Sequence, residues 1–168
     1  MNLSELLEEK RKNNSLLKGN YFPKSKAKAI ALVNISDKNI VDKLLEGLNV
    51  IPANFVFISN EEIKSEYQNI VFIKKYPIDI ESGFDFIIAD NEVDNLKNFI
   101  TKGITPIISE NNYLSSMLEE FNPIKVSGNS YLYKEENEWC IFYAIIRYLE
   151  NYKFPYDNRN LIKNLLEI

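Results

Sequence analysis

The chain has 168 residues, of which 45% are hydrophobic, and 20 Lys and Arg against 24 Asp and Glu give a net charge of −4. This length suits one hydrophobic core, so we expect a single domain over residues 1–168, with an N-terminal helix and linker over residues 1–27. The sequence has no His, which excludes His-based catalytic triads and His-ligated zinc, and its one Cys cannot form an internal disulfide. No apolar run reaches 18 residues, which excludes a membrane span. We therefore expect a cytoplasmic protein without a secretory signal.

Cations are concentrated near the N-terminus. Residues 10–28 hold seven cations and no acid, whereas residues 29–168 hold 13 cations and 21 acids. Such a basic arm on an acidic body could bind an anion or a nucleic acid. No aromatic stacking pattern accompanies these cations, so we interpret the arm as a solvated helix and linker and expect no nucleic-acid binding.

Apolar runs of strand length alternate along the chain with segments of helical periodicity. Helices are predicted over residues 2–17, 40–48, 61–67, 92–101, 112–121, 137–152 and 158–166. Strands are predicted over residues 28–33, 54–58, 70–73, 84–89 and 104–108, with a strand or hairpin at 131–133. Strands that are apolar on both faces, alternating with helices, predict a Rossmann-like three-layer α/β/α domain with a mainly parallel sheet.

Residues 137–152 form the longest predicted helical stretch. Its predicted buried stripe consists of Trp139, Phe142, Ile145, Ile146 and Leu149. Cys140 lies within this helix, and we expect a buried, inert thiol.

The loop over residues 34–39, after the first strand, contains no Gly. This excludes a dinucleotide fingerprint and a Walker loop, because both need Gly for the close approach of backbone N–H groups to phosphate. Ser36 and Asp37 favour a helix cap over a phosphate site. The alternative that Lys38 contacts a phosphate is left open.

Four acids, Asp85, Asp90, Glu92 and Asp94, are expected around the end of the fourth strand. Paired carboxylates there could hold a hard cation or act as acid and base. Three of them lie at the start of a predicted helix, where acids are favoured by the helix dipole. We therefore predict no metal site, no cofactor and no catalytic residue.

The last third of the chain carries a family pattern. Its Trp-x-Ile-Phe-x-Ala-Ile-x-Arg-x-x-Glu-x-Tyr run over residues 139–152 resembles the C-terminal domain of bacterial glycogen synthases and plant starch synthases. Further matching positions are Lys10, Asn13, Asn14, Leu17, Gly83, Asp85, Gly103, Pro106, Asn122, Pro123, Gly128, Tyr131, Tyr133 and Pro155. The resemblance implies one half of a GT-B glycosyltransferase, the half that binds ADP-glucose, while the acceptor glucan binds the other domain.

The chain departs from this family pattern on its ligand-facing loops. The family's phosphate-binding Arg falls near Ile35 or Ser36 and is missing, although its Lys can be aligned with Lys38. Glu92 stands for the family's acid without the Gly-Leu that follows it, and the family's Gly-Gly pair becomes Asn112-Tyr113. A diphosphate bound without Arg, glycine backbone donors or a metal would leave its charge unpaired.

The resemblance therefore implies a degenerate glycosyltransferase domain acting as a non-catalytic binding or interaction module. A nucleotide-sugar-binding half of a split enzyme, working with a separate acceptor-domain chain, stays open, as does a nucleotide or sugar-phosphate sensor. A homodimer is a further expectation for the partner. The candidate nucleotide-binding residues are Ser36, Lys38, Asp90, Asn91, Glu92, Ser109 and Asn112.

Overall fold

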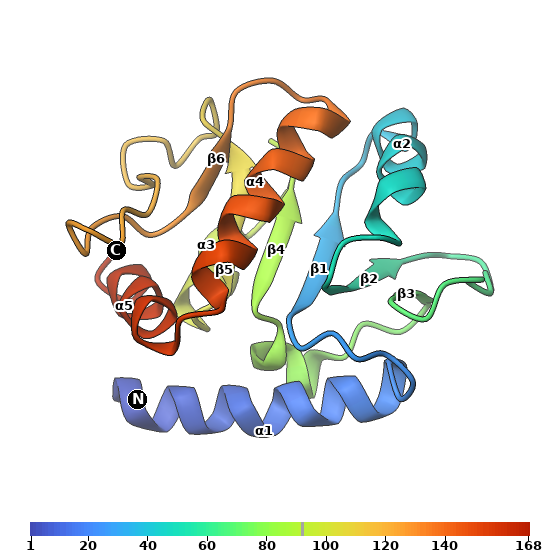
Figure 1. Cartoon of the computed structure of the whole chain (residues 1–168), viewed down its shortest axis with the longest axis horizontal. Helices are drawn as coiled ribbons and strands as arrows, with labels where there is room; N and C mark the ends of the chain where they lie inside the picture. Colours follow the sequence, from blue (N-terminus) through green and yellow to red (C-terminus); the bar gives the residue numbers. More distant parts are fainter. Residues whose placement is uncertain (92) are drawn as a thin grey trace.

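The computed structural model describes residues 1–91 and 93–168. Its centre is a six-stranded sheet of order β3-β2-β1-β4-β5-β6, in which every neighbouring pair is parallel (Figure 1). The strands are β1 (Ile30–Asn34), β2 (Asn54–Ile58), β3 (Ile70–Ile73), β4 (Phe86–Ala89), β5 (Thr105–Ser109) and β6 (Tyr131–Tyr133). This confirms the predicted Rossmann-like α/β domain, and β6 is a parallel edge strand.

Alternate residues of each strand enter two separate cores, one on each face of the sheet. Ala31 and Val33 of β1 pack with α2 (Lys38–Leu48) and α4 (Glu138–Tyr152). Ile30 and Leu32 face the opposite core, which contains residues of α1 (Leu3–Tyr21) and α3 (Leu96–Thr101). The helix α5 (Pro155–Leu165) contributes to both cores. The sheet is thus the middle of three layers.

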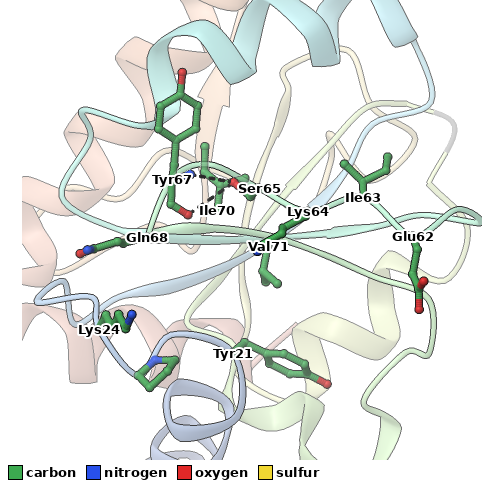
Figure 2. Close-up of a pocket in the computed structure, with 11 residues that line it drawn as sticks. Tyr21, Lys24, Glu62, Ile63, Lys64, Ser65, Tyr67, Gln68, Ile70 and Val71 are labelled. Carbon is green, nitrogen blue, oxygen red and sulfur yellow. Dashed lines mark hydrogen bonds between the residues drawn. The ribbon is translucent and has the colours of Figure 1, made fainter.

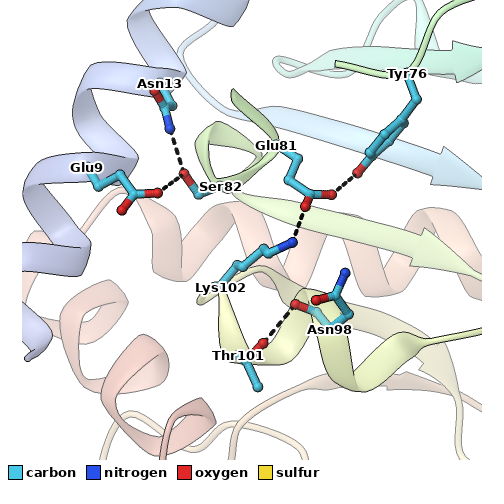
Figure 3. Close-up of polar contacts among 8 residues, drawn as sticks. All are labelled: Glu9, Asn13, Tyr76, Glu81, Ser82, Asn98, Thr101 and Lys102. Carbon is cyan, nitrogen blue, oxygen red and sulfur yellow. Dashed lines mark hydrogen bonds and ion pairs between the residues drawn. The ribbon is translucent and has the colours of Figure 1, made fainter. Parts of the chain in front are cut away.

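The first helix, α1, runs across the base of the sheet, below the points where β1 and β4 begin (Figure 1). A capping box between Asn2 and Glu5 starts it. It packs on the short helix η1 (Ile78–Gly83), where Asn13 Nδ2 donates to Ser82 Oγ at 2.8 Å and Ser82 Oγ donates to Glu9 Oε1 at 2.9 Å (Figure 3). The predicted N-terminal helix is therefore confirmed, but it is solvated on one side only, because Leu6, Lys10, Asn13 and Leu17 are buried against the fold.

On its other side, η1 is held by a buried carboxylate. The Glu81 side chain accepts a hydrogen bond from Tyr76 Oη at 2.6 Å and forms an ion pair with the Lys102 ammonium group (Figure 3). Burial, and the neighbouring Glu81 carboxylate, raise the pKa of Tyr76 above its usual value. Both faces of η1 are thus fixed by polar contacts.

Two predicted helices are absent. Over residues 61–67 the apolar side chains Ile63 and Tyr67 are both half-exposed, and Ser65 Oγ accepts from the Tyr67 N–H at 3.1 Å. The segment is irregular backbone with bends instead of a helix. Over residues 112–121, Asn112 Oδ1 accepts from the Leu114 N–H, and Asn129 holds Glu119 N–H at 3.0 Å. These side-chain bonds favour a chain of turns over a helix.

The buried stripe of α4 also differs from the prediction. It consists of Ile141, Ala144, Ile145, Tyr148 and Leu149. Trp139 is 74% exposed and Ile146 is half-exposed, so the stripe lies about a quarter-turn from the expected one. Cys140 is only partly buried. Within the described parts of the chain, no helix is long and apolar enough to cross a membrane.

Candidate functional site

The candidate site lies at the carboxyl edge of the sheet. The chain leaves β1 toward β2 and β3 on one side, whereas β4, β5 and β6 extend on the other, so β1 and β4 flank the topological switch point. Ligands of open α/β sheets bind at such a point. Ser36 and Lys38 follow β1, Asp90 and Asn91 follow β4, and Ser109 and Asn112 end or follow β5. The structure therefore brings these predicted residues to one edge, while Glu92 lies outside the described residues.

Hydrogen bonds join the two loops at the switch point. Asp90 Oδ2 accepts from the Ser36 backbone N–H at 2.7 Å and from Ser36 Oγ at 2.6 Å. Asp90 is only 7% exposed. A carboxylate therefore lies where a Rossmann-like fold would receive a phosphate, and it uses the first-loop N–H that would otherwise face that phosphate.

The N-terminus of α2 carries a second carboxylate. Asp37 is its N-cap and accepts from the N–H groups of Asn39 at 2.9 Å and Ile40 at 3.4 Å. This confirms a cap at this loop, with Asp37 as the capping residue and Ser36 bonded to Asp90. Lys38 is exposed at the first helical position. A phosphate approaching this helix end would meet the Asp37 carboxylate.

The polar residues after β5 bond to their own loop. Asn112 Nδ2 donates to the Ser109 carbonyl at 2.7 Å, and Ser109 Oγ accepts from the Asn111 N–H at 3.2 Å. Beside them, Tyr133 Oη donates to the Ala89 carbonyl at 2.6 Å, and burial raises the pKa of Tyr133 above its usual value. Asn91 is exposed. Ser109 and Asn112 therefore shape the loop, and their hydrogen-bonding groups are largely committed.

The segments that directly follow β1, β4, β5 and β6 carry mostly negative charge. Their acids are Asp37, Asp90, Asp94, Glu110, Glu135 and Glu136, and their cations are Lys38 and Lys134. An edge with this balance repels a nucleotide diphosphate unless a cation is supplied. In the part of the chain that the structure describes, no cluster of three or more acidic or Cys side chains could hold a metal ion.

Asp85 was expected at the same edge, and this is wrong. It precedes β4 and lies at the amino end of the sheet, on the opposite side of the domain from Asp90. Its Oδ2 accepts from the Ile30 N–H at 2.8 Å and from Asn14 Nδ2 at 3.0 Å. Lys10 lies nearby, is buried, and donates to the Ser82 and Phe84 carbonyls at 2.9 and 2.7 Å.

Burial opposes charge on both members of this pair. Burial raises the pKa of the Asp85 carboxyl to about 6, against the opposing effect of Lys10. Burial also lowers the pKa of the Lys10 ammonium to about 8, although Asp85 and Glu9 act in the other direction. The two groups stabilise each other in a site that would otherwise exclude them.

The positions that resemble the glycogen and starch synthase pattern thus lie in the structural framework of the domain. Lys10, Asn14 and Asp85 meet at the base of the sheet, although they come from distant parts of the sequence. Elsewhere, Arg147 Nε donates to Glu120 Oε1 at 2.8 Å and Arg147 Nη2 donates to the Leu132 carbonyl at 2.7 Å, which ties α4 to β6. The side chains at these matching positions hold α1, β4 and α4 in place.

A separate pocket of about 540 Å³ lies beside the edge strand β3 (Figure 2). Its lining comes from Tyr21 at the end of α1, Ile63 and Tyr67 of the loop before β3, and Ile70 and Val71 of β3. The sequence missed this pocket because a helix was predicted over residues 61–67. It lies at the β3 edge, with β2 between it and the switch point, so it is not the expected nucleotide site.

The sheet order and the switch point define a Rossmann-like α/β domain. Comparison with solved structures shows that the chain has the fold of one half of a GT-B glycosyltransferase. The starch synthase IV catalytic domain from Arabidopsis thaliana, solved with ADP and acarbose, superposes with a TM-score of 0.74 at 14% identity, over 100% of this chain and 40% of that chain. This confirms the fold that the family resemblance implies.

Two further glycosyltransferases are similar over most of the chain. The spinosyn forosaminyltransferase SpnP has a TM-score of 0.59 at 11% identity, over 88% of this chain and 41% of its own. SnogD from Streptomyces nogalater has a TM-score of 0.54 at 13% identity, over 85% of this chain and 40% of its own. The chain thus spans about two fifths of these proteins. No family model matches the sequence, and no curated protein is significantly similar to it.

Proposed function

We propose that this domain is a glycosyltransferase-like binding or interaction module that does not itself transfer glucose. The observation that carries the proposal is the Asp90 carboxylate bonded to Ser36 across the switch point, at 2.6 and 2.7 Å. A donor diphosphate at this edge would have to displace Asp90 from Ser36 and face the Asp37 carboxylate on α2.

Charge makes that displacement unfavourable. A diphosphate in a partly desolvated site needs cations or several backbone donors. Lys38 is the one cation of the first loop, and it is exposed. The Asp37 cap already satisfies the first N–H groups of α2, so the helix end offers less to an anion.

A transfer assay tests this proposal. With ADP-glucose as donor and a maltooligosaccharide as acceptor, we expect no glucose incorporation above a protein-free control, and no difference between the native chain and Lys38→Ala. An active starch synthase in a parallel reaction checks the assay. Incorporation that depends on this chain and disappears in Lys38→Ala would overturn the proposal.

A second candidate is the donor half of a split glycosyltransferase that acts with a separate acceptor-domain chain. It is supported by the superposition of this whole chain on 40% of a starch synthase catalytic domain solved with ADP and acarbose. Mixing the chain with a separately produced acceptor domain of a starch synthase should then restore transfer. No transfer in the mixture, in the same assay, favours the non-catalytic module.

A further inference from the structure

A basic groove lies at the amino end of the sheet, on the side of the domain opposite the expected nucleotide site. It consists of two adjoining pockets of about 370 and 590 Å³, which share Tyr152, Pro155 and Asn158. The first is bounded by α1 and α5, and the second by the linker before β1 and the end of α4. We call it the basal groove.

Six cations line the basal groove. Lys10, Arg11 and Arg159 line one pocket, and Lys26, Lys28 and Lys153 line the other. All of these except Lys10 are exposed. This concentration stands out on a chain of net charge −4, and it gives a role to the cation-rich segment over residues 10–28. A cleft lined by one sign of charge concentrates ions of the opposite sign.

Three acids lie in or near the basal groove: Asp85 in its lining, Glu150 of α4, and Asp157 in the first turn of α5. Asp85 is the acid in its lining, and its carboxylate accepts from Ile30 and Asn14 beside the buried Lys10. Lys153 pairs with Glu150 at 2.8 Å, but both side chains are exposed. Such a surface pair contributes about 0–1 kcal/mol, so it does not prevent Lys153 from turning to an anion.

The first turn of α5 supports the same assignment. This helix has 11 residues, its N-cap makes no side-chain cap hydrogen bond, and Pro155, Asn158 and Arg159 of its first turns line the groove. The positive end of a helix dipole therefore lies beside the cations, although Asp157 in the same turn offsets part of it.

We propose that the basal groove binds a small molecule that carries two or three linked phosphate groups. Linked phosphates match five exposed cations spread over two adjoining pockets, with Arg11 and Arg159 suited to bidentate contacts. The compact shape favours this ligand over an extended nucleic acid, which needs a continuous track with stacking aromatics. Inorganic oligophosphate and the phosphate chain of a nucleotide share this chemistry.

Titration calorimetry at constant ionic strength tests the proposal, with sodium tripolyphosphate as the probe. We expect saturable 1:1 binding. The Lys26→Gln/Lys28→Gln/Arg159→Gln variant should weaken it by at least about tenfold, since three phosphate contacts are lost. The control Lys74→Gln/Lys97→Gln/Lys125→Gln removes the same charge from exposed positions outside the groove and should change the affinity by less than about twofold. Unchanged thermal unfolding verifies that both variants fold.

Three results would overturn the proposal: no saturable binding, equal weakening in both variants, or tighter binding of an oligouridine of about twelve nucleotides than of tripolyphosphate. ATP and adenosine distinguish the two phosphate sources. Binding of ATP that tripolyphosphate displaces, with no binding of adenosine, identifies the phosphate chain as the recognised group. Because no glucosyl donor is present, failure here leaves the proposed function untouched.

Discussion

Gly83→Ala should destabilise the domain by about 2–4 kcal/mol, the range expected when an added group meets packed backbone. A Cβ at Gly83 would lie 2.4 Å from the carbonyl carbon of Asn13 and 2.5 Å from the backbone nitrogen of Asn14. These atoms belong to α1, so the whole helix would have to move away from η1. That movement would break the Asn13 to Ser82 bond and the Asn14 bond to the Gly83 carbonyl.

Thermal unfolding measures this effect. A loss of that size lowers the midpoint by roughly 5–15 °C in a domain of this length. Gly19→Ala is the matched control, because a Cβ there meets nothing within 4 Å and Gly19 lies within α1. We expect this control to gain about 0.5–1 kcal/mol from helix propensity. Equal midpoints for Gly83→Ala and the native chain would show that α1 does not pack on η1 this closely.

Lys10→Met should also cost about 2–4 kcal/mol, because it removes the positive charge that acts on the buried Asp85 carboxylate. The Ser82 and Phe84 carbonyls would lose their donor at the same time. Adding Asp85→Asn removes the orphaned charge and keeps an oxygen for the Ile30 N–H, so the double variant should recover much of the loss. Denaturant unfolding of the two single variants and the double variant gives the coupling energy. Additive losses would contradict the pairing.

The same pair predicts a pH dependence. Burial raises the pKa of Asp85 to about 6 in the folded chain, against 3.8 for an exposed carboxyl group. The folded state therefore holds more protons than the unfolded state between these values, and the contribution of Asp85 to stability falls as pH rises from about 4 to 6. The pKa of Lys10 is about 8 against 10.5, so the folded state holds fewer protons there and stability rises from about pH 8 to 10.5.

Asp85→Asn isolates the acidic part of this profile. The difference in unfolding free energy between the variant and the native chain should shift in favour of the variant as pH rises from 4 to 6. Denaturant unfolding at pH 4, 5 and 6 measures the shift. Parallel profiles over this range would show that the Asp85 pKa is not raised by folding.

The alternation of apolar strands and helices predicted the layers because burial on both faces leaves a clear mark on a sequence. The two helices that failed are short segments where local side-chain bonds decide the backbone. Ser65 bonds to the Tyr67 N–H, and Asn129, ten residues away in the chain, fixes Glu119. Such bonds compete with helix formation and leave little trace in hydrophobic periodicity.

The candidate edge was predictable because loops after parallel strands share one end of the sheet. The hydrogen bond between Ser36 and Asp90 could not be predicted, since it joins residues 54 positions apart in the chain. Asp85 was misplaced because it was grouped with the acids that follow β4, although the predicted strand over residues 84–89 already put it at the amino end. The basal groove combines Arg11, Lys26 and Arg159 through packing of α1 and α5, although the cation-rich segment itself was visible in the sequence.

We propose that the carboxyl edge of this sheet does not receive a nucleotide sugar. The most direct test is a titration of nitrogen-15-labelled protein with millimolar ADP-glucose, followed by the amide NMR signals of each residue. We predict no saturable shifts for residues 34–39, 90–91 and 109–113, and any saturable shifts should fall on residues 10–14, 26–28 and 152–159 around the basal groove. Saturable shifts in the carboxyl-edge loops that disappear in Lys38→Ala would contradict the account.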